Sequence, residues 1–145
     1  MSRLRRGELV ASMFDELRRM VANSVLFNLH MADVLKMNPI DLQFINLLDI
    51  HGPMTPGRLA ELSRLTTGGV TVALDRLEKA GAIRRERNPR DRRSSLVRAE
   101  LKFLRSAESA YKKMADATAD LLAQFSDKEL TTVLAFLKKA NDVRP

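Results

Sequence analysis

Small polar residues followed by proline, together with one glycine, divide this chain into helices of very different lengths. Asn38-Pro39 and Thr55-Pro56 each place a side-chain oxygen before a proline. This pair is typical of a helix start, where the oxygen caps the helix and proline takes its first position. Gly81 comes directly after the apolar residues of a predicted helix, and glycine is common just past a helix end. These start and stop signals therefore predict short helices between two long helical arms.

The apolar residues between these boundaries recur at the spacing of one side of an α-helix. The predicted helices span residues 8–37, 39–50, 56–62, 68–80 and 101–125, and a last one begins at the capping box of residues 126–129. Two short stretches, 82–87 and 94–100, flank a polar link and predict a β-hairpin. We therefore expect a mainly α-helical fold with a small β-hairpin.

Positive charge is concentrated in one part of the chain. The net charge is +7, and residues 58–98, with ten arginines and one lysine against five acids, supply +6 of it. Such an asymmetry points to a polyanion as the partner of this segment. The planar guanidinium group of arginine also suits phosphates and guanine edges.

Two short helices joined by a polar turn and followed by a basic hairpin form the plan of a winged helix-turn-helix. The second helix of such a pair enters the major groove of DNA. The alternative is that a threonine there only caps the helix and the glycines only loosen its first turn. The candidate DNA-contacting residues of this recognition helix are Thr66, Thr67, Gly68, Gly69, Thr71, Val72 and Arg76.

The predicted hairpin carries seven arginines within residues 84–98. Arginines at a loop tip can enter a narrow minor groove, where negative potential is concentrated. The alternative is a solvated charged loop, which this density of arginine disfavours. The candidate wing residues are Arg87, Arg90, Asp91, Arg92 and Arg93.

The helices after the hairpin carry a heptad-like apolar seam, a pattern suited to helix–helix packing. The seam can serve an intrachain core or a dimer. We predict a homodimer with long N- and C-terminal dimerisation helices, residues 1–37 and 101–145, around a DNA-binding lobe of residues 38–100. The candidate interface residues are Leu104, Tyr111, Met114, Leu121, Phe125 and Leu134.

Several other classes of function find little support in the sequence. The chain has no cysteine, which excludes disulfides and Cys-ligated metals, and His30 and His51 lie in no His or Cys cluster. No catalytic motif is evident, so we expect neither an enzyme nor a cofactor or metal. We also expect a cytoplasmic protein, because no apolar run is long enough to span a membrane.

Three stretches together resemble one family, the MarR family of bacterial transcriptional regulators. They are PGRLAEL at residues 56–62, LDRLEKAG at residues 74–81 and NPRDRRS at residues 88–94. The Asp91-Arg92-Arg93 wing after a Leu-Glu-Lys-x-Gly helix end is the most specific part, and the flanking helices also fit in number and order.

The resemblance implies more than the residues alone. Members of this family form homodimers through their first and last two helices and bind palindromic operators, usually as repressors. Many release DNA when a small, often phenolic or anionic, molecule binds. By the motif match, Asp91 would brace the wing by pairing with an arginine, and Arg92 or Arg93 would reach the minor groove. No effector-binding residue is predicted, and control by a partner protein, or the absence of any effector, is the alternative.

Overall fold

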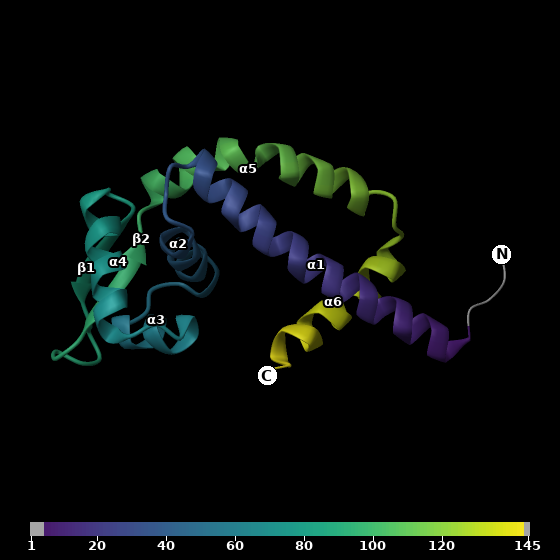
Figure 1. The fold of residues 1–145 in the computed structure, drawn as a ribbon, viewed down its shortest axis with the longest axis horizontal. Coiled ribbons are helices and arrows are strands. Elements are labelled where there is room, and N and C mark those ends of the chain that lie inside the picture. Colours follow the sequence, from purple (N-terminus) through teal and green to yellow (C-terminus); the bar gives the residue numbers. More distant parts are fainter. Residues whose placement is uncertain (1–4, 144–145) are drawn as a thin grey trace. The chain divides into compact units, whose positions relative to one another are not determined.

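The computed structural model describes residues 5–143, and these form helices and one antiparallel hairpin (Figure 1). The elements in chain order are α1 (Arg6–Val34), α2 (Pro39–His51), α3 (Pro56–Ser63), α4 (Thr67–Lys79), β1 (Ile83–Arg87), β2 (Ser95–Ala99), α5 (Leu101–Leu122) and α6 (Asp127–Asp142). The mainly α-helical fold with a hairpin is therefore confirmed. Within residues 5–143, no helix is both long and apolar enough to cross a membrane.

The predicted helix starts are confirmed by hydrogen bonds from backbone N–H groups. The Asn38 side chain accepts from the N–H of Ile40 at 2.8 Å, and Thr55 Oγ1 accepts from Arg58 at 3.2 Å. Each bond satisfies a donor that a helix N-terminus leaves without an intrahelical partner. Gly81 has φ +68°, the left-handed conformation expected just past the end of α4.

Two helices end earlier than the periodicity predicts. α1 ends at Val34 because Lys36 turns into the left-handed region, with φ +53°, and the N–H of Met37 then donates to Ala32 O at 2.8 Å. α5 ends at Leu122, a few residues before Ser126 caps α6. Apolar residues beyond a helix end can still follow its spacing, so the periodicity alone does not locate a terminus.

The chain forms two compact units, one up to Ala107 and one from Glu108 onwards, and α5 contributes to both. The first unit contains the core. Its largest fully buried side chains come from α2, α3, α4 and the hairpin, which Figure 1 shows gathered together, and include Phe44, Leu59, Leu74 and Val97. In this core, apolar side chains of α4 and of the hairpin pack against each other.

The hairpin is joined to the rest of the first unit by backbone hydrogen bonds. β1 and β2 pair in register, with Ile83 opposite Ala99 and Arg85 opposite Val97. On its other side Val97 exchanges two hydrogen bonds with Met54, of 2.8 and 3.1 Å, in the link between α2 and α3. The root of the hairpin is therefore held on both sides, and its tip extends beyond the core.

The second unit consists of helical segments that bury few side chains. Ser126 and Glu129 form the predicted capping box at the start of α6, with Ser126 N donating to Glu129 Oε2 at 2.9 Å. That carboxylate accepts from the Ser126 hydroxyl and N–H, which lowers the pKa of Glu129. α6 itself has no buried residue, and four of its large apolar side chains are exposed: Val133, Leu134, Phe136 and Leu137.

Candidate nucleic-acid interface

The helix α4 is amphipathic, with one side against the core and the other exposed. Its buried side packs on the core through Val70, Ala73, Leu74 and Leu77, as the periodicity predicts. The first half of its exposed side carries no charged group. All seven candidate recognition residues are exposed: Thr66, Thr67, Gly68, Gly69, Thr71, Val72 and Arg76.

The threonines at the start of α4 have structural partners. Thr66 Oγ1 accepts from the N–H of Gly69 at 3.1 Å, so Thr66 is the helix cap. The Thr71 hydroxyl donates to the Thr67 carbonyl at 2.9 Å. Gly68 differs from both, because a Cβ added there would meet nothing within 4 Å. The helix backbone at Gly68 is therefore open to an approaching ligand.

Arg76 makes a bidentate ion pair with a buried carboxylate. Its Nε and Nη2 donate to the two oxygens of Asp41 at 3.0 and 2.7 Å. The Asp41 side chain is 7% exposed, whereas that of Arg76 is 48% exposed. The hydrogen bond raises the pKa of Arg76, although partial desolvation opposes it. The pair ties α4 to the start of α2 and leaves part of the guanidinium accessible.

Arg85 on β1 bridges two acids of α4. Its Nη2 lies 2.6 Å from Asp75 Oδ1, and its Nη1 lies 2.5 Å from Glu78 Oε2. The hydrogen bond with Asp75 is the main cause of a raised pKa for Arg85. This contact joins residues up to ten positions apart and was not predicted, although alternation along the strand places Arg85 on the same face as buried Ile83.

Arg84 and Arg98 are opposite each other in the hairpin register, where two like charges would repel. Glu86 offsets this repulsion by accepting from Arg98 Nη2 at 3.0 Å, which lowers the pKa of Glu86. Arg84 Nε lies 3.8 Å from Glu86 and 3.6 Å from Glu100. Both arginines are therefore occupied with acids at the root of the hairpin.

The hairpin tip is held by hydrogen bonds of two side chains to the backbone. Asp91 Oδ1 accepts from the N–H of Arg93 at 2.9 Å, and Asn88 Oδ1 accepts from the N–H of Arg90 at 3.0 Å. Asn88 also donates to the Ser94 hydroxyl at 2.8 Å. The resemblance implies an Asp91–arginine side-chain pair, but in the described part of the chain Asp91 contacts a backbone N–H and no ion pair of it is found. Asn88, which is not among the candidate wing residues, also stabilises the tip.

The remaining hairpin arginines differ from those at the root. Within residues 5–143, the structure shows no ion pair for four of them: Arg87, Arg90, Arg92 and Arg93. These are the arginines of the predicted wing. Their charge is not neutralised within the described chain, so it is available to a polyanion.

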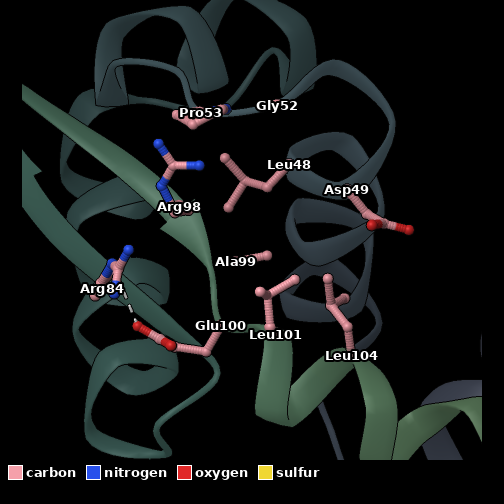
Figure 2. Close-up of a pocket in the computed structure, with 10 residues that line it drawn as sticks. All are labelled: Leu48, Asp49, Gly52, Pro53, Arg84, Arg98, Ala99, Glu100, Leu101 and Leu104. Atoms are coloured by element: carbon pink, nitrogen blue, oxygen red, sulfur yellow. Dashed lines mark ion pairs between the residues drawn. The ribbon is translucent and has the colours of Figure 1, made fainter.

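A pocket of about 300 Å³ lies where α2, the hairpin and the start of α5 meet (Figure 2). Leu48, Leu101 and Leu104 give it apolar walls. Arg84 and Arg98 reach it from the hairpin, and Figure 2 shows Glu100 beside Arg84. The lining thus combines an apolar floor with a few charged groups.

The predicted interface residues fall into two groups. Leu104 packs against the core of the first unit, and Tyr111 is half-buried, which raises the pKa of its hydroxyl. The other four are large apolar side chains that remain 44–53% exposed: Met114, Leu121, Phe125 and Leu134.

Comparison with known proteins links this arrangement to one family. The model of the MarR family matches residues 41–95, the segment that contains α3, α4 and the start of β2. The uncharacterized HTH-type transcriptional regulator YcgE of Bacillus subtilis is 33% identical over 138 residues, which cover 95% of this chain and 90% of that protein.

Solved structures share the fold over almost the whole chain. A MarR family protein from Bacillus stearothermophilus has a TM-score of 0.70 at 24% identity, covering 95% of this chain and 96% of its own. Wild-type MarR from E. coli has a TM-score of 0.58 at 22% identity, covering 97% of this chain and 98% of its own. Given the family match, the YcgE similarity and this fold, the chain belongs to the MarR family of winged helix-turn-helix, DNA-binding transcriptional regulators.

Proposed function

We propose that this protein is a homodimeric transcriptional repressor that binds a palindromic operator through α4 and the hairpin tip. The observation that carries this proposal is the contrast within the hairpin. Arginines at its root are paired with acids, as Arg85 is with Asp75, whereas those at its tip, such as Arg92, have no ion pair among the described residues. The start of α4, which is uncharged and open, suits contact with base edges. The arginines at the hairpin tip suit contact with phosphates.

In this proposal α4 reads bases and the wing supplies affinity. The start of α4, around Gly68 and Thr71, enters the major groove. Arg92 and Arg93 reach an adjacent minor groove or its phosphates, which makes binding strongly dependent on salt. Arg76 holds Asp41 and presents its exposed part to the DNA backbone.

Exposed apolar side chains support the homodimer. α1 leaves Phe14 and Leu26 63% and 64% exposed, and α5 and α6 leave Leu121 and Leu134 about half exposed. A monomer in water rarely keeps so many large apolar groups uncovered. A second copy of the chain would cover them with side chains of the same kind.

The dimer is tested by its mass and its footprint. We expect light scattering at micromolar concentration to give twice the mass of one chain. On DNA selected from a random library by the purified protein, we expect protection of two half-sites about 10 base pairs apart, because each protomer contacts one. A reporter downstream of that site should be less active with the protein than without it. A monomeric mass, or protection of a single half-site, would contradict the symmetric model.

Release by a small molecule is the regulatory part of the proposal. The pocket beside the hairpin root supports it, because its volume of about 300 Å³ suits a small ligand and its lining combines apolar side chains with charged ones. A ligand there would touch both Arg98 at the root of the hairpin and Leu101 of α5. The alternative is control by a partner protein, which would not depend on this pocket.

Filling the pocket separates these two forms of control. Leu101 is 68% exposed, so Leu101→Trp can cover the pocket without disturbing the buried core. We expect compounds that displace the selected DNA from the wild type to lose this effect on the variant, while DNA affinity stays within about twofold, because the wing contacts are unchanged. Displacement that is equal for both proteins would move the effector site elsewhere.

A further inference from the structure

Arg85 joins α4 to the hairpin, the two parts of the protein that are proposed to contact DNA. It lies on β1, yet both of its side-chain partners, Asp75 and Glu78, lie on α4. The two acids are one helical turn apart and share one exposed side of α4, where their like charges would repel each other. One guanidinium fork spans both carboxylates and removes this repulsion.

We propose that Arg85 is a positioning residue that fixes the hairpin against α4, so that the recognition helix and the wing meet DNA in one arrangement. This inference rests on the proposed DNA-binding function. The fork makes charge-assisted hydrogen bonds of 2.5 and 2.6 Å, the strongest kind of side-chain hydrogen bond, to two separate groups. The Arg85 side chain is 31% exposed, whereas the side chains of Asp75 and Glu78 are 61% and 41% exposed, so the guanidinium is the more shielded side of the contact.

The backbone alone does not fix this relation. Hairpin hydrogen bonds join β1 to β2, and Met54 joins β2 to the α2–α3 link. Among the described residues, the backbone link from α4 to the hairpin is a hydrogen bond from the N–H of Ala82 to Leu77 O at 2.9 Å, which lies just before β1 begins. The Arg85 contacts supply polar links between those two elements. A looser hairpin would keep its charge and its attraction to any DNA, but the arginines of its tip would no longer be placed for one particular site.

The neighbouring arginine provides a matched control. Arg84 lies on the same strand and carries the same charge, but its ion pairs with Glu86 and Glu100 are 3.8 and 3.6 Å long and neither acid is on α4. Arg84→Gln and Arg85→Gln therefore remove equal charge from the hairpin root, and only the second removes the link to α4.

The test measures affinity for two DNAs: the fragment that the wild-type protein selects from a random library, and sheared unrelated DNA. For Arg85→Gln we expect about tenfold weaker binding of the selected fragment and at most about a twofold change for unrelated DNA. Arg84→Gln should weaken both to a similar, small extent. Equal behaviour of the two variants on both DNAs would overturn the positioning role.

A second variant distinguishes an effect of charge from an effect of positioning, because the two predict opposite changes in affinity for the selected DNA. Asp75→Asn with Glu78→Gln removes two negative charges, so electrostatics alone predicts tighter binding of every DNA. A positioning role predicts that the selected fragment is bound about tenfold more weakly, as with Arg85→Gln. Thermal unfolding near the wild-type temperature shows that each variant is folded. Tighter binding of the selected fragment by the double variant refutes the inference, whereas failure of the wild type to select any sequence refutes the proposed function itself.

Discussion

Replacing Arg92 and Arg93 together with alanine should lower affinity for the selected DNA fragment by roughly a hundredfold at physiological salt. These arginines lie at the hairpin tip, where no ion pair of either is found within residues 5–143. Their charge is therefore free to displace counterions from DNA. The slope of log affinity against log salt should become shallower by about one unit for each arginine that contacts a phosphate.

The double variant should keep its fold, because the tip is braced through the backbone. Asp91 accepts from the N–H of Arg93, and alanine retains that donor. Asn88 likewise holds the N–H of Arg90 and the Ser94 hydroxyl. We therefore expect an unchanged unfolding temperature, so that a loss of binding reports on the arginine side chains.

A second double variant separates the wing from net charge. Arg18→Ala with Arg19→Ala removes the same two charges from exposed positions on α1, where each arginine faces an acid three residues away. Binding should weaken slightly, with a salt slope close to that of the wild type. If the α1 variant and the wing variant bind the fragment equally, the hairpin tip does not contact DNA.

Features that depend on neighbouring residues could be predicted from the sequence. The caps at Asn38, Thr55 and Ser126 each bond to an N–H within three positions, and Gly81 takes its left-handed conformation at one site. Local chemistry of this kind is fixed whatever the rest of the fold does. The helices and the basic hairpin were therefore within reach of sequence reasoning.

Pairing between distant residues could not be predicted in this way. Arg76 and Asp41 are 35 positions apart, and their contact depends on how α2 packs against α4. Which hairpin arginines are occupied depends on the register that places Arg84 opposite Arg98 and turns Arg85 towards α4. The sequence shows seven similar arginines, and only the packed structure divides them into braces at the root and free cations at the tip.

A side chain added at Gly68 should weaken DNA binding without harming the fold. A Cβ there would meet nothing within 4 Å, and glycine is a poor helix former, so Gly68→Ala should leave stability unchanged or raise it. If the start of α4 enters the major groove, however, the added atoms would lie against DNA. We expect Gly68→Leu to lower affinity for the selected fragment by about ten- to a hundredfold, as overpacking does in a close-fitted interior, and Gly68→Ala by less.

Gly7 supplies the control for this effect. It occupies the same second position of its helix, in α1, and also has nothing within 4 Å of an added Cβ. Gly7→Ala and Gly7→Leu therefore change helix propensity in the same way at a site that the proposal keeps away from DNA. A graded loss of binding at Gly68, with none at Gly7 and no fall in unfolding temperature, is the signature of backbone packed closely on DNA. Wild-type affinity for Gly68→Leu would mean that the α4 N-terminus does not enter the groove, and the hairpin tip would then have to account for binding alone.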